Sequence, residues 1–439
     1  MLPQASPHYA LILLDGLGDR PHPETGRVSP VEAAKTPHLD RLLALGQSGQ
    51  VVVVGPEIAP ESDAGVLALL GYDPQRESPG RGVLEALGVG VPLGRGDVAL
   101  RINFATTDGR DLVIDSRVGR TLSTEEAREL SRSLTAGDLL ADQGIHAEVR
   151  ATVGHRGVLW LHPLRDGDLS PNISNSDPFY DRLGGLGQAR TGGEPRLRQV
   201  EPLDDSNEAK RTARAINTFL ARVPSVLAGN GVNARRALAG RKVANGLLTR
   251  NAGSAPPADF PTFESRHGLP GAAVTEMPVE RGIARLLGLK DRYVGPMGPD
   301  LEHGYAERAR VTRQALADTP FVYVHLKGPD EPGHDGDAVR KQAVVESIDR
   351  WFFGPFLDGL DLGSVRLAVT ADHATPCILK AHSSDPVPWL LAGTGIAPEP
   401  PPSELPQKFS ERRTAAGMLG TRRGAEVLPK LLGVRIDPA

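Results

Sequence analysis

The sequence feature that most constrains the fold is a continuous apolar run, Tyr9–Leu14, that ends at Asp15 and Gly16. A half-exposed strand alternates apolar and polar residues, so an unbroken run of this length predicts a strand buried on both faces. Such a strand needs covering helices, and the leucines of Pro37–Leu45 recur at helical spacing. The segment therefore predicts a βα unit that delivers Asp15 to a loop at the carboxyl end of a strand.

The same pattern returns near the other end of the chain. Phe321–Leu326 and Val365–Thr370 are short β-rich runs, and each is followed by a polar, acid-bearing loop. Ala338–Leu357 between them predicts a helix. Ligands of open α/β sheets bind beyond the carboxyl ends of the strands. We therefore expect Asp330 and Asp372 at the same edge of the sheet as the acid that follows the first strand.

The middle of the chain differs from both ends. Residues 76–241 are rich in glycine, proline and charge, whereas helices and apolar strands resume after them. A length of 439 residues suits two domains. The predicted fold is α/β, with an alkaline-phosphatase-like core of a central, mostly parallel sheet flanked by helices (residues 1–75 and 242–439). Residues 76–241 are predicted to form an inserted, smaller α/β lid domain.

Composition excludes several classes of function. The formal net charge is -4, and the basic residues form no block of the kind that nucleic acid or an anionic membrane selects. No apolar run approaches the roughly 18 residues of a membrane span, and no leader is evident, so we expect a cytoplasmic protein with a small-molecule substrate. The single cysteine, Cys377, cannot form an intrachain disulfide or a thiolate metal site, and we expect it to serve packing.

Acids and histidines cluster on the loops after the predicted strands, in a pattern typical of metal ligands. They are Asp330, His334, Asp372, His373 and His382, to which Asp15 and Ser62 are added from the N-terminal part. Carboxylate oxygens and imidazoles suit Mn²⁺ or Zn²⁺, and this number of ligands suits two ions. Each residue alone is more often a surface or capping residue. Their joint placement at strand ends favours a metal site.

Ser62 has two interpretations. It precedes Asp63 and the helical run Ala64–Leu70, so it could be a helix N-cap. A helix N-terminus also stabilises a phosphoryl group, and a nearby metal would lower the pKa of the hydroxyl and make it a nucleophile. Both interpretations can hold together.

Five motifs occur in a known order. They are Asp15–Pro21, Pro60–Gly65, Gly71–Pro74, Asp330–His334 with the spacing Asp-x-x-Gly-His, and Thr370–His373. The chain resembles the archaeal type of cofactor-independent (2,3-bisphosphoglycerate-independent) phosphoglycerate mutase, a family of the alkaline phosphatase superfamily. The resemblance implies one metal ion at Asp15, Ser62, Asp372 and His373, and another at Asp330, His334 and His382. The ions would be Mn²⁺, or alternatively Zn²⁺, Mg²⁺ or Co²⁺, with no 2,3-bisphosphoglycerate.

The resemblance also implies further site residues. Substrate-binding residues would be Arg101, Asn103, Arg117, His155, Arg156 and Asn230, together with Arg266, which stands where the family usually has lysine. Arginines suit phosphate and carboxylate because they bind both in bidentate fashion. Asp177 and Lys327 would be catalytic, although a lysine that leaves a strand is often a solvated flank.

The implied activity is interconversion of 3-phosphoglycerate and 2-phosphoglycerate through phosphorylated Ser62, in glycolysis and gluconeogenesis, with the lid domain excluding water. The main alternative is a phosphatase or another phosphomutase of the same superfamily, because the metal and serine residues leave the substrate open. A non-catalytic binding protein is a second alternative, and the intact set of candidate ligands speaks against it. The sequence leaves the preferred metal, the oligomeric state and the physiological direction open.

Overall fold

The computed structural model describes residues 7–165, 167–183, 186–190, 192–402 and 404–434. The chain divides into two compact units. The first comprises Met1–Glu77, Pro261–Glu280 and Ala284–Ala439, and the second comprises Ser78–Phe260 with Arg281–Ile283.

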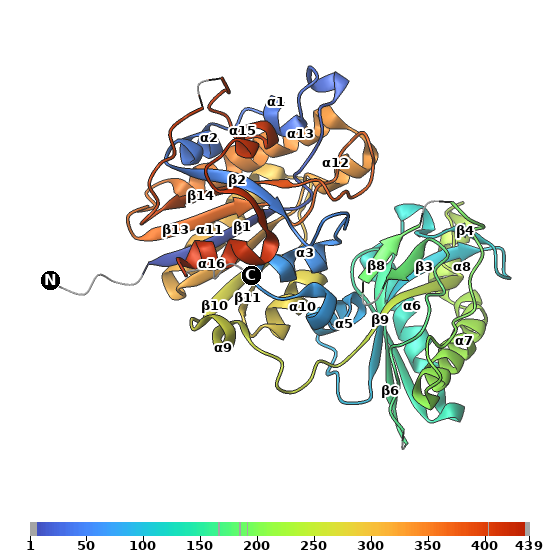
Figure 1. Ribbon diagram of the computed structural model, residues 1–439. Coiled ribbons are helices and arrows are strands. Elements are labelled where there is room, and N and C mark those ends of the chain that lie inside the picture. The colour runs from blue at the N-terminus through green and yellow to red at the C-terminus, as the bar shows by residue number, and fades with distance from the viewer. Residues whose placement is uncertain (1–6, 166, 184–185, 191, 403, 435–439) are drawn as a thin grey trace. The chain divides into compact units, whose positions relative to one another are not determined.

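The first unit is built on an 8-stranded sheet of order β11-β10-β12-β1-β13-β14-β2-β15 (Figure 1). All neighbours from β11 to β13 are parallel, β14 is antiparallel to both β13 and β2, and β15 is parallel to β2. The strands are β1 (His8–Leu14), β2 (Gly46–Val52), β10 (Gly271–Thr275), β11 (Lys290–Tyr293), β12 (Phe321–Leu326), β13 (Val365–Thr370), β14 (Val387–Gly393) and β15 (Gly420–Arg423). The expected α/β fold with a mostly parallel central sheet is confirmed.

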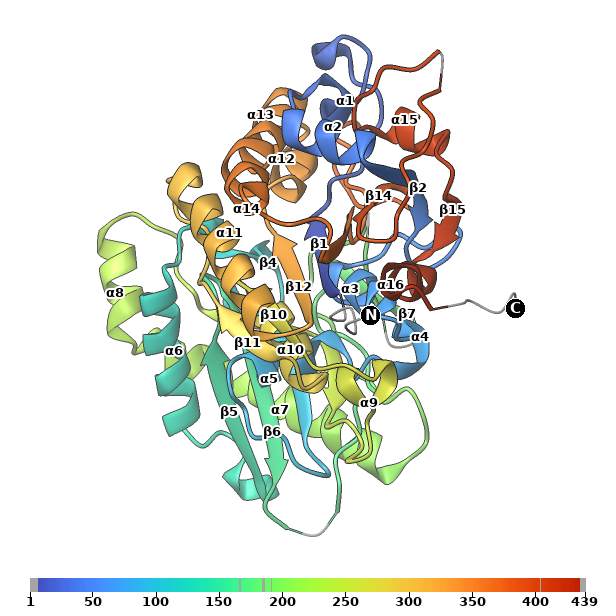
Figure 2. The same ribbon diagram turned by 90° about the vertical axis from the view of Figure 1, so that its left-hand side faces the viewer.

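Helices cover both faces of this sheet, as expected for strands that are apolar on both sides. Figure 2 shows α11, α13 and α14 on one face and α16 on the other. The helices of this unit are α1 (Pro30–Ala33), α2 (Pro37–Ala44), α3 (Ser62–Leu69), α4 (Pro74–Glu77), α9 (Phe263–His267), α10 (Pro278–Leu286), α11 (Leu301–Asp318), α12 (Asp330–Asp335), α13 (Ala338–Ile348), α14 (Gly354–Leu357), α15 (Glu411–Ala415) and α16 (Gly424–Leu432). A 3-10 turn (Pro23–Thr25) and a π-helical segment (Asp349–Phe353) complete the unit.

The central strands end at the same level, and this alignment positions the candidate site. Leu14 of β1 is in register with Leu326 of β12, and Leu13 with Thr370 of β13. These strands are almost fully buried. The next residues of all three strands therefore enter loops at one edge of the sheet.

A buried lysine on α13 holds two of these loops together. The Lys341 ammonium lies 2.9 Å from Asp19 Oδ2 and donates hydrogen bonds to the carbonyls of Gly18 and Thr375. Lys341 has no solvent exposure. Three acceptors match the three donors of an ammonium group, so the loops after β1 and β13 are fixed relative to each other.

The second unit carries a 5-stranded antiparallel sheet, in which β9 joins the order β4-β3-β6-β5 through β3. Its strands are β3 (Val98–Thr107), β4 (Val113–Asp115), β5 (Ile145–Ala151), β6 (Arg156–Pro163) and β9 (Gly246–Ser254), with a separate hairpin of β7 (Tyr180–Leu183) and β8 (Leu186–Ala189). Its helices are α5 (Arg81–Gly88), α6 (Thr124–Ala136), α7 (Asn207–Ala228) and α8 (Gly231–Leu238), with 3-10 turns at Val118–Arg120 and Ala141–Gln143.

The boundary of the second unit differs from the expected one. The sequence placed the return to the core at residue 242, whereas the unit extends to Phe260. The reason is β9, which pairs with β3 along almost its whole length and so belongs to the antiparallel sheet. Within the described residues, no helix combines the length and apolar character needed to cross a membrane.

Candidate metal centre

The seven predicted ligands lie on four segments of the first unit. Asp15 follows β1, Ser62 begins α3, Asp330 and His334 lie on α12 after β12, and Asp372, His373 and His382 lie between β13 and β14. Ser62 is the first helical residue, and Glu61 before it occupies the N-cap position. The N-cap interpretation of Ser62 is therefore wrong, because the helix begins one residue earlier than the sequence pattern suggested.

The first ligand group gathers around Ser62. Its Oγ lies 3.4 Å from Asp15 Oδ1 and 3.3 Å from His373 Nε2. His373 Nε2 in turn lies 3.4 Å from Asp15 Oδ1 and 3.4 Å from Asp372 Oδ2. Tetrahedral ligands at about 2.0–2.1 Å from a Zn²⁺-sized ion are separated by about 3.4 Å. These spacings fit a bound divalent cation.

A buried oxygen supports the same conclusion. Asp372 Oδ2 is shielded from solvent and has no hydrogen-bond partner among the described residues. His325 Nε2 lies 3.3 Å from this oxygen without making a hydrogen bond, so a buried oxygen that needs an interaction can still accept one from a cation. Asp372 Oδ1, by contrast, accepts a hydrogen bond from the Gly16 backbone N–H at 3.2 Å. The carboxylate thus has one oxygen anchored and one available.

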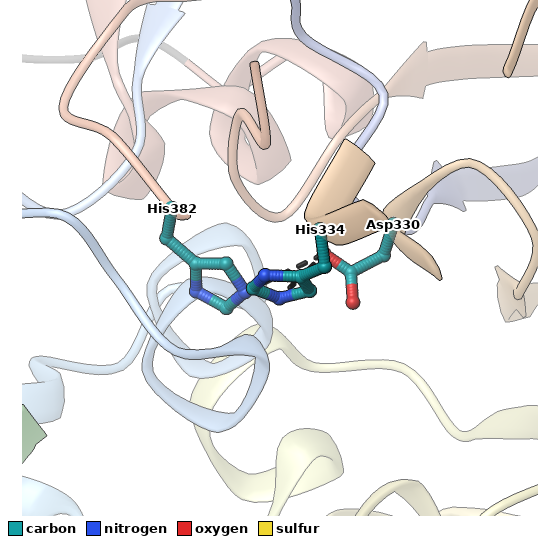
Figure 3. A group of neighbouring side chains, drawn as sticks. All are labelled: Asp330, His334 and His382. Carbon is teal, nitrogen blue, oxygen red and sulfur yellow. Dashed lines mark ion pairs between the residues drawn. The ribbon is translucent and has the colours of Figure 1, made fainter. Parts of the chain in front are cut away.

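The second ligand group consists of Asp330, His334 and His382 (Figure 3). Asp330 Oδ1 lies 3.5 Å from His334 Nε2 and 3.4 Å from His382 Nε2. The two histidine rings are 5.0 Å apart, and the His382 ring stacks on His373 of the first group at 3.8 Å. The two ligand groups are therefore neighbours, as a two-metal site requires.

The three histidines present the same nitrogen to the candidate ions. The Nδ1 atoms of His334 and His382 face the backbone carbonyls of Lys380 (3.2 Å) and Pro60 (2.8 Å). His373 Nδ1 faces the Thr375 hydroxyl at 3.0 Å. A proton on Nδ1 satisfies each of these acceptors and leaves the Nε2 lone pair directed at the carboxylates. Partners of this kind orient histidine ligands in metal sites.

Three further charged residues lie behind the first group. Lys327 Nζ is 3.2 Å from Asp15 Oδ2 and 2.9 Å from Glu280 Oε1. His325 Nε2 is 3.3 Å from Asp372 Oδ2, and its Nδ1 is 3.4 Å from Glu280 Oε1. Glu280 and His325 are buried. Two cationic side chains thus stand between three carboxylates.

This network sets the protonation of its members. Burial alone would raise the pKa of Asp15, but the ammonium of Lys327 beside Oδ2 outweighs it and holds this pKa well below its ordinary value. Burial would also raise the pKa of Glu280. Lys327 and His325 outweigh this effect and lower the pKa to about 2. Burial and the charge of Lys327 would lower the pKa of His325. The carboxylates of Asp372 and Glu280 have the larger effect and raise this pKa to about 9. At neutral pH Asp15 and Glu280 are therefore ionised.

His325, Glu280 and Thr375 were missed in the sequence. His325 lies inside an apolar strand, where a buried histidine is unremarkable, and Glu280 lies on a helix whose face is unknown without the fold. Lys327 was predicted as a catalytic residue, and the structure places its ammonium at Asp15 rather than in solvent.

The second unit gathers a separate set of predicted residues around two carboxylates. Arg101 Nε lies 3.3 Å from Glu85 Oε1, which also accepts a hydrogen bond from Arg81 Nε at 3.1 Å. Arg250 pairs with Asp177 and stacks over the Tyr180 ring. Arg81 and Arg250 were missed in the sequence, although an arginine inside the strand-like run of β9 would have been a usable signal.

Excess positive charge shapes this cluster. Burial and then Arg81 lower the pKa of Arg101 to about 9. Burial and then Arg156 and Arg117 lower the pKa of His155 to about 3, so this histidine is neutral. More guanidinium groups than carboxylates meet here, and an anion would relieve their repulsion.

The remaining predicted residues have local structural partners. Asn103 Nδ2 donates to the carbonyl of Ser116 at 3.4 Å. Asn230 caps α8, because its Oδ1 accepts from the Val232 N–H and its Nδ2 donates to Ser133 Oγ. Arg266 pairs with Glu77, donates to the carbonyl of Gly71 and stacks over Tyr72. Substrate contacts by these three residues stay predictions.

Comparison with known proteins identifies the family. The family model for 2,3-bisphosphoglycerate-independent phosphoglycerate mutase matches residues 44–233. Proteins of that name from Aeropyrum pernix and Pyrococcus abyssi are 43% and 36% identical to this chain, over 96% of it and over 98% and 96% of their own length. A solved cofactor-independent phosphoglycerate mutase from Thermoplasma acidophilum is 30% identical, with a TM-score of 0.64 over 97% of this chain and 99% of that chain. A solved Pyrococcus horikoshii protein gives a TM-score of 0.78 at 28% identity, over 99% of both chains. With this similarity along nearly its whole length, the chain belongs to the family of 2,3-bisphosphoglycerate-independent phosphoglycerate mutases.

Proposed function

We propose that this chain interconverts 3-phosphoglycerate and 2-phosphoglycerate without 2,3-bisphosphoglycerate, and that Ser62 carries the phosphoryl group. The observation that carries the proposal is the position of Ser62 Oγ, 3.4 Å from Asp15 and 3.3 Å from His373, beside a second ligand group. Such a cycle serves glycolysis and gluconeogenesis. The names of the relatives give the substrate class.

The residues present fit two divalent cations, of which Mn²⁺ is our first choice, with Zn²⁺, Mg²⁺ or Co²⁺ as alternatives. One would be held by Asp15, Ser62, Asp372 and His373, and the other by Asp330, His334 and His382. When bound, the ions would supply charge stabilisation for the phosphoryl oxygens and for the Ser62 oxygen. Lys327 would hold Asp15 ionised and in place, because its ammonium contacts Asp15 Oδ2.

The chemistry consists of two displacements at phosphorus. In the first, Ser62 Oγ loses its proton and bonds to phosphorus while the bond from phosphorus to the 3-oxygen of glycerate breaks, and that oxygen gains a proton. In the second, the 2-hydroxyl loses its proton and bonds to the same phosphorus, the bond to Ser62 Oγ breaks, and Ser62 Oγ regains a proton. The phosphoryl group is conserved, so no external phosphate donor is needed.

The cationic cluster of the second unit is proposed to bind the anionic groups of phosphoglycerate. Burial lowers the pKa of His155 most, and the positive charges of Arg156, Arg117 and Arg101 around it lower this pKa further. Asp177 is the proposed catalytic carboxylate of this unit, and its pairing with Arg250 fixes its position. Guanidinium groups suit phosphate and carboxylate alike.

A coupled enolase assay tests the proposal. The metal-free protein is assayed with 3-phosphoglycerate, with and without Mn²⁺, and no 2,3-bisphosphoglycerate is added. We expect activity that depends on Mn²⁺ and does not rise when 2,3-bisphosphoglycerate is supplied. Release of inorganic phosphate without 2-phosphoglycerate would instead identify a phosphatase of the same superfamily.

A further inference from the structure

One buried hydroxyl contacts a ligand from each of the two candidate metal groups. Thr375, in the loop after β13, donates from Oγ1 to Asp330 Oδ1 at 2.7 Å. The same oxygen lies 3.0 Å from His373 Nδ1. Thr375 has no solvent exposure, so water cannot replace either contact. His373 belongs to the first group and Asp330 to the second.

The hydroxyl proton fixes the direction of both hydrogen bonds. A threonine hydroxyl has one proton and two lone pairs. Because an ionised carboxylate can only accept, the proton goes to Asp330, and the hydroxyl accepts the Nδ1–H of His373. This arrangement leaves His373 Nε2 as the lone pair that faces Asp15 and Asp372. One side chain therefore sets the tautomer of His373 and the position of Asp330 together.

The surrounding backbone is shaped to hold Thr375 in place. A Cβ atom added to Gly16 would lie 2.7 Å from Thr375 Oγ1, and one added to Gly333 would lie 2.9 Å from Thr375 Cγ2. Gly16 also has a φ of +62°, which favours glycine. The backbone of Thr375 donates to the Gly18 carbonyl at 3.0 Å and accepts from Lys341 at 2.9 Å. The loop after β1 and the helices α12 and α13 thus close on this residue.

We propose that Thr375 is a positioning residue that joins the two metal groups into one hydrogen-bonded unit. This inference rests on the two-metal part of the proposed function. Loss of an outer partner of a ligand typically lowers metal affinity by about 10–100-fold. Removal of the Thr375 hydroxyl should weaken both metal sites, because it leaves His373 Nδ1 and Asp330 without a shared partner.

The test compares matched variants of the full chain. Thr375→Val removes the hydroxyl and keeps the shape, and Thr375→Ser keeps the hydroxyl. Thr312→Val is the control, because Thr312 on α11 is equally buried and its hydroxyl donates to the Arg308 carbonyl at 2.7 Å. Each metal-free protein is titrated with Mn²⁺ by calorimetry, and electron paramagnetic resonance reports whether two Mn²⁺ ions are coupled.

We expect two coupled Mn²⁺ ions in the wild type, in Thr312→Val and in Thr375→Ser. For Thr375→Val we expect both affinities to fall by about 10–100-fold and the coupling signal to be lost at Mn²⁺ concentrations that saturate the wild type. If Thr375→Val does not fold, Thr375→Ala is titrated in its place with the same expectation.

Two results would overturn the inference, and they are distinguishable. Wild-type affinities in the hydroxyl-free variant, or weakening at one site alone, would show that Thr375 does not join the groups while the two-metal proposal stands. A wild-type protein that binds fewer than two Mn²⁺ ions would remove the two-metal proposal itself and this inference with it.

Discussion

Lys327 stands between two carboxylates, and its replacement should expose their repulsion. In Lys327→Met, Asp15 and Glu280 lose the ammonium that lies 3.2 and 2.9 Å from them. Breaking a buried ion pair typically costs about 3–5 kcal/mol. We expect a loss of this order in the free energy of unfolding of the metal-free protein, measured in urea.

The double variant Lys327→Met with Glu280→Gln is the control for this prediction. It removes the negative charge of one of the two carboxylates that lose the ammonium, so it should recover part of the lost stability. Equal stability of Lys327→Met and the wild type would contradict the arrangement.

Cys377 lies close to the ligand loop, yet its surroundings argue against reactivity. Burial and then Asp19 raise the pKa of its thiol to about 12, so the thiolate is scarce at neutral pH. We expect Cys377→Ala to keep most of the mutase activity and the native protein to resist alkylation by iodoacetamide. Rapid alkylation of the native protein with loss of activity would contradict this expectation.

Helices and strands that a local sequence pattern identifies could be predicted from the sequence. Pro37–Leu45, Phe321–Leu326 and Val365–Thr370 closely match α2, β12 and β13, because their apolar pattern and their ends are local. The place of β9 was not predictable, because its pairing with β3 is a contact between segments distant in the chain.

The residues of the candidate site also divide into those that the sequence pattern identifies and those whose role depends on the fold. Carboxylates and histidines at strand ends carry their own chemical signal, and the structure brings Asp330, His334 and His382 together as predicted. His325 and Glu280 gave no signal, because their role depends on which side chains the packed fold puts beside them. Thr375 was missed for the same reason, since hydroxyls are common in loops.

α15 (Glu411–Ala415) contributes a partly buried acid, Glu411, that should make stability depend on pH. Glu411 accepts hydrogen bonds from the Asp19 N–H and from Ser29 Oγ, and burial raises its pKa to about 7. A raised pKa means that the folded protein holds the proton more tightly than the unfolded chain. This contribution to stability therefore declines as pH rises from the ordinary value of 4.5 to about 7.

The variant Glu411→Gln mimics the protonated acid. We expect its Tm to match that of the wild type at pH 5 and to exceed it at pH 8. A higher Tm for the wild type at pH 8 would show that the ionised carboxylate is the stabilising form. Thermal unfolding followed by circular dichroism provides both values.

The sheet of the second unit presents the arginine cluster, and one member is accessible enough for a clean test. Arg117 is partly exposed and contributes to the lowered pKa of His155. Loss of a charge-assisted contact costs about 1.5–3 kcal/mol, so Arg117→Ala should lower kcat/KM roughly tenfold to a hundredfold with unchanged metal content. Arg235→Ala is the control, because Arg235 is exposed and pairs with Glu129. Equal kinetics for both variants would show that Arg117 does not contact substrate.

At the scale of the whole molecule, the two units gather side chains that bind ions of opposite charge. The first gathers carboxylates and imidazole lone pairs that suit cations, and the second gathers guanidinium groups that suit anions. Under the proposed function, the first set would hold the metal ions, and the second would bind the phosphate and carboxylate groups of phosphoglycerate.

The most direct test of the proposed reaction is mass spectrometry of the enzyme quenched during turnover with 3-phosphoglycerate. Activity of Ser62→Ala alone would not suffice, because that change also removes a candidate metal ligand. We expect a phosphoryl group on the peptide that contains Ser62, present during turnover and absent without substrate. Repeated absence of this modification, together with labelled oxygen from water in released phosphate, would contradict transfer through Ser62 and identify the protein as a hydrolase.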